Sequence, residues 1–408
     1  MNPVGNPNSD YMKNNRRKFV KQSAFLAGIS ALPVSMTSLD WKEEKPVNVG
    51  VIGAGSRGQG LISIMNEMEG LNVNAICDVM PFRIEETKKM VPSAKAYETY
   101  TDLLKDNMLD AVVISTPFAL HADMAIAAIR ADKHVYCEKT LARGINALQL
   151  MVDTQKQSKR IFQTGHQYHS SPLYQKVVKI IQSGYIGEVT GFSCQWNRNA
   201  DWRRPVLDPK WERLVNWRMY REYSGGLMAE LCSHQVDFIN WVLDATPTKV
   251  TGFGGIDHWK DGRETFDNIH VLFEYPGGID ASFTCTTTNG YEDYKIRVLG
   301  KKGTIILDYT RGEIFAEKTD AKELGIVDGV SGATVQAWEE GKGAPIGAPG
   351  NDPTIDALQQ FHASITRGAP VISTLRSGAQ TAKCVQIALD AMNEEKVKYW
   401  SDYPELKF

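Results

Sequence analysis

The sequence predicts an α/β protein in which an N-terminal Rossmann domain, a doubly wound parallel sheet, is followed by a C-terminal α+β domain with a large, mostly antiparallel open sheet. Between residues 47 and 137, short apolar segments alternate with helical patterns. Such uninterrupted apolar strands are typical of a parallel sheet that helices cover on both faces. Beyond about residue 165, strand patterns dominate and short turns such as 276–278 join them, which indicates antiparallel pairing.

The hydrophobic periodicity predicts the individual elements. In the first domain we expect strands at 47–52, 73–77, 111–115 and 134–137, with helices at about 59–68, 83–90 and 122–130. In the second domain we expect a helix at 171–183, strands at 188–196, 249–254, 269–275, 279–287, 295–299 and 304–308, a long loop at about 325–352, and helices at 356–366 and 377–394. One face of the second sheet lacks a predicted cover, so we expect a homo-oligomer interface there.

The length of 408 residues exceeds one compact core, so we expect separate domains. Residues 1–45 are expected to form an export signal and linker, 46–165 the Rossmann domain, and 166–408 the α+β domain, whose C-terminal helices can pack back on the first domain. Arg16 and Arg17 precede a mostly apolar stretch at 24–32. They look like a twin-arginine export signal, which predicts a periplasmic protein. The alternative is a basic amphipathic helix at the start of a cytoplasmic protein.

The overall composition limits the classes of partner. The net charge is −2, with 42% hydrophobic and 23% charged residues, which is ordinary for a globular protein. A balance this close to neutral gives no electrostatic reason to expect nucleic acid or an anionic membrane surface as a partner. The six cysteines lack CxxC spacing and lie mostly in apolar stretches, which predicts buried thiols and no structural zinc site.

A glycine-rich turn follows the first predicted strand and opens the first predicted helix. Gly53, Gly55 and Gly58 have the spacing of a dinucleotide-binding turn. The first glycine permits the turn, the second lets the backbone approach the pyrophosphate, and the third lets the helix pack closely. Asp78 lies 20 residues after Gly58 (78 − 58), at the end of the second strand. A carboxylate there bonds the ribose hydroxyls and repels a 2′-phosphate, so we expect NAD as the cofactor.

Further cofactor contacts are expected inside the turn and at the ends of the next strands. They are Ser56, Arg57, Thr116, Pro117, His121, Glu138 and Lys139. For His121, a solvent-facing side chain is an equal alternative. Lys139 follows a parallel strand and is expected to point into the ligand crevice, where its ammonium can hold a substrate hydroxyl and stabilise a developing alkoxide.

Several motifs together resemble the Gfo/Idh/MocA oxidoreductases, the group of glucose–fructose oxidoreductase and inositol dehydrogenase. They are Gly-Ala-Gly-Ser-Arg-Gly at 53–58, Ser-Thr-Pro at 115–117, Glu-Lys-Thr at 138–140, Ser-Gly-Tyr-Ile-Gly-Glu-Val at 183–189 and Gly-Gly-Leu-Met-Ala-Glu-Leu-Cys-Ser-His-Gln-Val-Asp at 225–237. The resemblance implies that His234 is the general acid/base and that Lys139 and Glu230 assist it. Thr140 stands where the family usually has Pro, and Glu230 where it usually has Asp.

The residues themselves support this hypothesis. Glu230 and His234 lie four positions apart in a helix-compatible segment, so we expect them on one helix face. A histidine beside a carboxylate suits proton transfer near neutral pH. The alternative is a structural His–Glu pair within a helix.

Substrate contacts are expected from two further segments. His166, Tyr168 and His169 lie where the chain enters the second domain, and many family members carry Arg in place of His169. The two histidines have ligand chemistry for a metal, but alcohol oxidation with Lys139 present needs no Lewis acid, so we expect no metal. Trp202 and Arg203 belong to a segment rich in aromatic and polar residues, which suits a carbohydrate. Capping the sheet or forming an oligomer interface is an equal alternative.

Three functional hypotheses follow. The main one is an exported, NAD-dependent dehydrogenase that moves a hydride between nicotinamide and a hydroxyl carbon of a sugar, glycoside or polyol. The second is a glycosidase of the same superfamily that keeps NAD bound and works by oxidation, elimination and reduction. The third is a non-catalytic sugar or nucleotide sensor, against which Lys139, Glu230 and His234 argue together.

Overall fold

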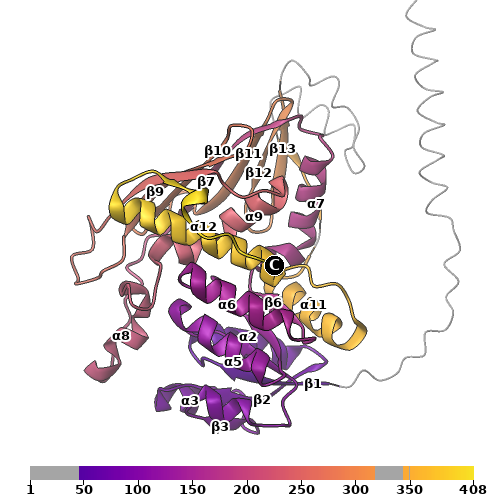
Figure 1. The fold of residues 1–408 in the computed structure, drawn as a ribbon, viewed down its shortest axis with the longest axis vertical. Coiled ribbons are helices and arrows are strands. Elements are labelled where there is room, and N and C mark those ends of the chain that lie inside the picture. Colours follow the sequence, from indigo (N-terminus) through magenta and orange to yellow (C-terminus); the bar gives the residue numbers. More distant parts are fainter. Residues whose placement is uncertain (1–45, 318–342, 349) are drawn as a thin grey trace, which may run out of the picture. The chain divides into compact units, whose positions relative to one another are not determined.

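The first part of the chain forms a parallel sheet. The computed structural model describes residues 46–317, 343–348 and 350–408. Six parallel strands lie in the order β3-β2-β1-β4-β5-β6 (Figure 1): β1 (Val47–Ile52), β2 (Leu71–Cys77), β3 (Lys95–Tyr97), β4 (Ala111–Ile114), β5 (His134–Cys137) and β6 (Phe162–Thr164). The strand order changes direction between β1 and β4, and ligands of such sheets bind beyond the carboxyl ends of the strands at this point.

Helices cover both faces of this sheet, as the apolar strands predict. On one face lie α2 (Ser56–Glu67), α3 (Pro81–Lys88) and, from the far end of the chain, α11 (Pro353–Arg367). On the other face lie α4 (Tyr100–Leu104), α5 (His121–Arg130) and α6 (Ile145–Lys156). The doubly wound arrangement is therefore confirmed.

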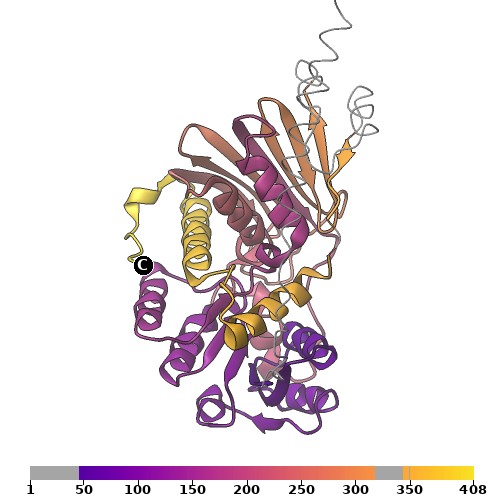
Figure 2. The same ribbon diagram turned by 90° about the vertical axis from the view of Figure 1, so that its right-hand side faces the viewer.

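The second part is built on a nine-stranded sheet in the order β14-β13-β12-β11-β7-β10-β9-β8-β15. Its strands are β7 (Val189–Asn197), β8 (Lys249–Gly255), β9 (Asn268–Tyr275), β10 (Ile279–Thr286), β11 (Tyr294–Gly300), β12 (Gly303–Leu307), β13 (Gly312–Ala316), β14 (Ala344–Pro345) and β15 (Lys398–Tyr399). Only β7 and β10 pair in parallel among the described strands of this sheet. Helices α7 (Pro172–Gln182), α9 (Ser233–Leu243) and α12 (Leu375–Glu394) pack on one face (Figure 2).

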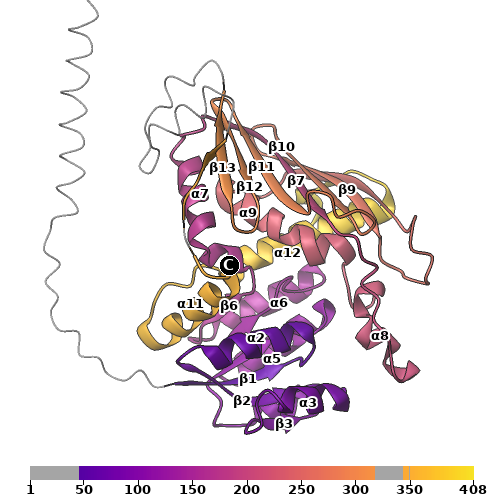
Figure 3. The ribbon, with the colours of Figure 1, turned by 180° about the vertical axis from the view of Figure 1, so that it is seen from behind.

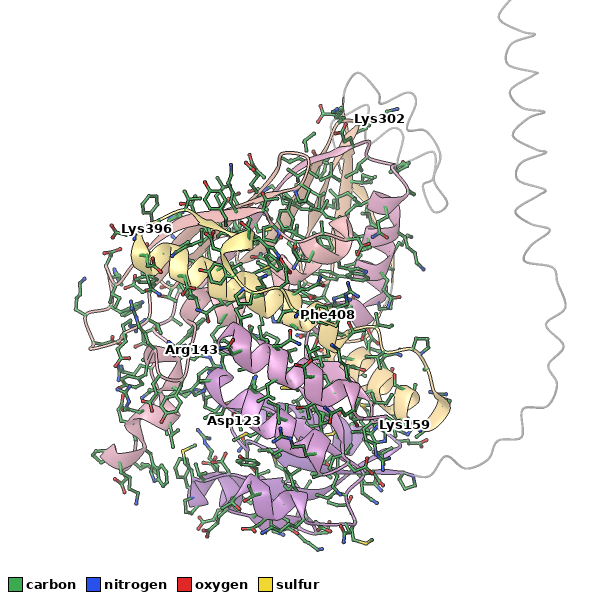
Figure 4. The ribbon with its side chains drawn as sticks, in the orientation of Figure 1. Asp123, Arg143, Lys159, Lys302, Lys396 and Phe408 are labelled. Atoms are coloured by element: carbon green, nitrogen blue, oxygen red, sulfur yellow. The ribbon has the colours of Figure 1, made fainter. Side chains whose placement is uncertain are left out.

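The last helix joins the two cores. Leu375, Ala379 and Ala382 at the start of α12 belong to the core beneath the first sheet, whereas the later residues 384–392 pack in the core of the second sheet. The C-terminal residues then return to α6, where the amide of Lys407 donates to Gln149 Oε1 over 2.8 Å, and Phe408 lies at this junction (Figure 4).

The structure adds elements that the periodicity did not predict. Helix α6 and the three-residue strands β3 and β6 lie in the first domain, and β13 to β15 complete the second sheet. The three-residue strands are too short to establish an alternating pattern. Helix α2 begins at Ser56 rather than near residue 59, because the glycine turn itself forms the first helical turn. Most of the predicted loop at 325–352 and the predicted export segment lie outside the described residues.

Between β7 and α9 the chain forms irregular structure and the short helix α8 (Glu212–Val215), which lies level with the Rossmann helices (Figure 3). This segment is the part of the second domain that faces the cofactor turn. Within the described residues, no helix is both long and apolar enough to cross a membrane.

Candidate functional site

The glycine turn forms a cradle that side chains would fill. Gly53 has a φ of 95°, which favours glycine, and a Cβ at Gly58 would lie 2.0 Å from the carbonyl oxygen of Gly53. Gly55, in contrast, has no atom within 4 Å of a built Cβ. The first turn of α2 therefore packs directly on the turn while its backbone N–H groups face open space. This is the geometry that receives phosphate groups.

Asp78 connects the second strand to the turn. One carboxylate oxygen accepts the amide of Ala54 over 2.8 Å and the other accepts the amide of Met80 over 2.9 Å. Burial raises the pKa of this carboxyl, and the two backbone amides oppose that shift. A carboxylate has about four acceptor sites, so Asp78 keeps capacity for ribose hydroxyls. The turn and Asp78 together fit a dinucleotide.

A single cavity of about 1530 Å³ joins the turn to the second domain. A pocket for one drug-sized ligand holds about 300–1,000 Å³, so this cavity has room for a dinucleotide and a substrate together. The predicted residues that line it are Gly53, Gly55, Ser56, Arg57, Asp78, Thr116, Pro117, His121, Glu138, Lys139, Tyr168, Trp202, Arg203, Glu230 and His234. Gly58 is buried beneath the turn.

Lys139 occupies the boundary between the domains. Its ammonium donates to the backbone carbonyl of Glu230 over 2.6 Å, and the next residue, Thr140, donates to the carbonyl of Ala229 over 3.1 Å. Burial lowers the pKa of Lys139, while the charges of Glu230 and Glu138 oppose that shift. The ammonium is thus fixed at the middle of the cavity instead of moving freely in solvent.

His121 lines the cavity and also connects two loops around it. It is 1% exposed, and its ring nitrogens lie 2.8 Å from the carbonyl oxygen of Thr140 and 2.9 Å from that of Thr116. Solvent-facing placement is therefore wrong. Because both nitrogens already contact backbone carbonyls, His121 supports the loops that carry Thr116 and Lys139.

His234 lies at the substrate end of the cavity among aromatic rings. The ring centroid of Tyr168 is 5.2 Å away and that of Trp196 is 5.6 Å away. Burial lowers the pKa of His234 well below its usual value, and the positive charge of Lys139 adds to this effect. Nδ1 is buried and has no hydrogen-bond partner among the described residues, so Nε2 is the nitrogen left to face the cavity. At neutral pH the ring is uncharged and can accept a proton.

The predicted Glu230–His234 pair is not formed. Residues Met228–Cys232 are π-helical, and both Glu230 and His234 line the cavity. The Glu230 carboxylate instead accepts from Arg218 Nε over 2.9 Å. The hydrogen bond to the expected partner is thus replaced by an ion pair at the cavity wall.

His166 and His169 lie behind His234 and do not line the cavity. His169 Nε2 is 2.8 Å from a carboxylate oxygen of Asp237, and its ring stacks on Trp241 with centroids 4.3 Å apart. The structure therefore does not bring His169 to the cavity wall, where a substrate contact was expected. Asp237, a buried carboxylate on α9, lies beside both rings, with His166 Nδ1 3.9 Å from its other oxygen. The described residues contain no cluster of three His, Cys, Asp or Glu side chains suited to a metal ion.

The cavity also contains side chains that sequence reasoning missed. Tyr309 lies in the turn after β12 and accepts from Arg198 Nη2 over 3.2 Å, and Asn351 and Asp352 enter from the start of α11. No motif marks these residues. The sequence shows only that these residues are aromatic or polar and lie in loops. The fold is needed to show which loops reach the cavity.

Comparison with known proteins agrees with this architecture. Residues 47–166 match the family model described as an oxidoreductase family with an NAD-binding Rossmann fold, and residues 174–306 match the model of the Gfo/Idh/MocA C-terminal domain. The chain belongs to the Gfo/Idh/MocA oxidoreductase family. Its first domain is the family's NAD-binding domain, and the resemblance inferred from the motifs is confirmed.

Relatives within the Gfo/Idh/MocA family have several names. The chain is 28% identical over 264 residues to the 2,7-anhydro-N-acetylneuraminate hydratase of Escherichia coli, covering 64% of this chain and 68% of the relative. It is 26% identical over 271 residues to the myo-inositol 2-dehydrogenase of Thermotoga maritima, covering 65% and 76%. A glycosyl hydrolase family 109 protein of Shewanella pealeana is 28% identical over 237 residues, and the chain spans about half the length of that relative (51% of each).

Solved structures share the fold of this Gfo/Idh/MocA chain. A levoglucosan dehydrogenase in complex with NADH and L-sorbose has a TM-score of 0.71 at 21% identity, over 88% of this chain and 99% of that one. An oxidoreductase domain protein from Kribbella flavida has a TM-score of 0.72 at 20% identity, over 88% and 100%. At these identities the likeness concerns the fold.

Proposed function

We propose that the protein is an NAD-dependent oxidoreductase that transfers a hydride between nicotinamide and a hydroxyl carbon of a sugar, glycoside or polyol. The observation that carries the proposal is that Lys139 and His234 line the same cavity as the glycine turn and Asp78. A proton acceptor and a cation are thus available beside a dinucleotide. Bound NAD would supply the hydride acceptor.

The protein's own residues would handle the proton and the charge. His234 is uncharged at neutral pH because burial lowers its pKa, so it can take the proton of a substrate hydroxyl. Lys139 has a fixed position through the Glu230 carbonyl and would stabilise the negative charge that grows on the oxygen. His121 keeps the Lys139 loop in place from behind.

The wall of the cavity supports a carbohydrate as substrate. Trp196, Trp202 and Tyr309 offer aromatic faces for C–H stacking. Arg218, which stacks over Trp217 at 4.4 Å, offers donors for hydroxyl groups, and its partner Glu230 offers carboxylate acceptors. Asp78 favours NAD over NADP, because a buried carboxylate repels a 2′-phosphate.

The second candidate is a glycosidase or lyase that retains NAD. Such a cycle needs a second proton-transfer group near His234, and Tyr168 lies beside it in the cavity. Burial raises the pKa of Tyr168, so its hydroxyl stays protonated and suits an acid rather than a base. Relatives named as a hydratase and as glycosyl hydrolases support this candidate.

One experiment on the purified protein tests these candidates. Candidate sugars and glycosides are added with NAD, and both the absorbance of NADH and the release of aglycone are followed. A dehydrogenase accumulates NADH with added NAD, whereas the retained-cofactor cycle releases aglycone without added NAD. His234→Ala should lower either rate by about 10²–10⁴-fold while NAD still binds. Near-normal turnover in His234→Ala would show that the proton moves through another group, and absence of any turnover with the unmodified protein would favour the sensor hypothesis.

We also propose export to the periplasm and assembly into homo-oligomers. The paired arginines support the first, and the half-exposed outer face of the nine-stranded sheet supports the second. Cell fractionation of Arg16→Lys, Arg17→Lys variants tests export, because loss of the pair should leave the protein in the cytoplasm. Light scattering at micromolar concentration tests assembly, and a monomer mass counts against it.

A further inference from the structure

A segment of the second domain reaches the cofactor turn. Arg204, which follows β7, donates from Nη1 to the hydroxyl of Ser56 over 2.8 Å. Ser56 is the first residue of α2 and lies between the second and third glycines of the turn. This hydrogen bond therefore places a guanidinium from the substrate domain at the phosphate-binding end of the cofactor domain.

The backbone around Arg204 is fixed independently of its guanidinium. The side chain of Asn216, which is 2% exposed, accepts from the amide of Arg204 over 2.7 Å and donates to its carbonyl over 3.0 Å. The neighbouring Arg203 pairs with Asp261 at 3.1 Å, and Arg263 donates to the carbonyl of Asp201 over 3.0 Å. Residues 201–204 are thus anchored to the second domain, and Arg204 extends from a rigid base.

Within the described part of the chain, the guanidinium of Arg204 has no negative partner. Other arginines that line the cavity pair with carboxylates: Arg57 with Glu138 and Arg218 with Glu230. Among the residues that the structure describes, no carboxylate lies within 4.0 Å of Arg204, and its side chain bonds only the neutral hydroxyl of Ser56. A helix N-terminus carries partial positive charge, so a cation is unfavourable there unless an anion lies between them. A dianionic pyrophosphate has the charge and the acceptor geometry that a guanidinium binds.

We propose that Arg204 binds the pyrophosphate of the dinucleotide from the substrate domain, so that both domains hold the cofactor and its release is slow. The proposal rests on the proposed function in that a dinucleotide occupies the turn. Arg204 adds to the backbone N–H groups of α2 a charged donor that the glycine motif does not contain. Release of the cofactor then requires breaking this bond, which should lower the dissociation rate of NAD and NADH alike.

Direct binding to the full chain tests the proposal. After removal of any copurified nucleotide, NADH binding is measured by fluorescence titration, and its dissociation rate by stopped-flow displacement. Arg204→Gln should raise the Kd by about tenfold or more, because a hydrogen bond to a charged group is lost, and most of this change should appear in the dissociation rate. Arg130→Gln is the matched control, since Arg130 is exposed at the end of α5 and does not line the cavity. It should bind NADH as the unmodified protein does.

Two further ligands show which part of the dinucleotide Arg204 contacts. ADP-ribose contains the pyrophosphate but no nicotinamide, so Arg204→Gln should weaken its binding by the same factor; adenosine contains no phosphate and should bind equally to both proteins. The unfolding temperature without cofactor should be unchanged in Arg204→Gln, because Asn216 holds the backbone. Arg204→Lys should recover part of the NADH affinity that Arg204→Gln loses. An NADH Kd within about twofold of the unmodified protein, or a loss confined to NADH, overturns the proposal. Failure of the unmodified protein to bind NADH would instead overturn the dinucleotide assignment itself.

Discussion

Alanine at Gly58 would test how the cofactor turn is built. A Cβ at this position lies 2.0 Å from the carbonyl oxygen of Gly53 and 2.8 Å from the hydroxyl oxygen of Ser115, whereas ordinary contacts begin near 3.4 Å. The start of α2 must therefore move away from the turn by about 1.4 Å (3.4 − 2.0). Because the nearest obstacle is backbone, it cannot rotate aside. We expect Gly58→Ala to lower the free energy of unfolding by about 1–3 kcal/mol or more, as overpacking does.

Two other glycines of the same segment provide matched substitutions. Gly55→Ala meets no protein atom within 4 Å, and its φ of −75° suits any residue. The loss of a glycine N-cap and the lower entropy of the unfolded chain oppose each other, so the free energy of unfolding should change by less than about 1 kcal/mol. Its methyl group would occupy the space above the turn, and NADH should therefore bind more weakly. Gly60→Ala lies on the exposed face of α2 with no atom nearby and should stabilise the helix by about 0.5–1 kcal/mol without affecting NADH.

The assay combines urea unfolding without cofactor and NADH titration for all three variants. The expected pattern is a loss of stability in Gly58→Ala alone and a selective loss of binding in Gly55→Ala. Unchanged stability of Gly58→Ala would refute the close packing of α2 on the turn. Unchanged NADH affinity of Gly55→Ala would refute the passage of the pyrophosphate over this glycine.

Three further predictions concern charge. Asp78→Asn keeps one of the two acceptor oxygens and removes the charge, so the preference for NADH over NADPH should fall by about tenfold in binding titrations. An unchanged ratio of the two affinities would assign the selectivity elsewhere. Lys139→Met removes a buried ammonium, so the midpoint temperature of unfolding should stay equal or rise, while turnover should fall by about 10²-fold or more. A variant with full turnover would exclude Lys139 from the chemistry. Burial lowers the pKa of four histidines, that of His134 to about 4, so below pH 6.5 the unfolded chain binds more protons than the folded protein. The urea concentration at the unfolding midpoint should therefore be constant from pH 8 to 6.5 and fall toward pH 5. A midpoint that does not change with pH would contradict the burial of these rings.

Local patterns in the sequence were sufficient for the cofactor half of the molecule. The apolar strands at 47–52 and 111–115 and the glycine spacing at 53–58 depend on neighbours within one βα unit, so they predicted both the sheet and the turn. The antiparallel second sheet was equally predictable from its strands and short turns. Strands β6 and β13 and helix α6 were missed, because their short or mixed patterns become stable only through contacts with distant segments.

The substrate half of the site was decided by the tertiary structure. Spacing alone paired Glu230 with His234, but the distant Arg218 lies beside the carboxylate and is its partner. His169 was expected in the cavity, and the buried charge of Asp237 holds it behind.

The sequence by itself determined the fold class, the family and the dinucleotide turn, because each rests on short-range periodicity or on a motif whose members are neighbours in the chain. Only the tertiary structure decided which polar side chains meet at the substrate. Lys139 contacts the carbonyl of Glu230, 91 positions away, and Arg204 contacts Ser56, 148 positions away. Such contacts depend on how two domains pack and on where each buried charge finds a partner, and neither property leaves a periodic signal in the chain.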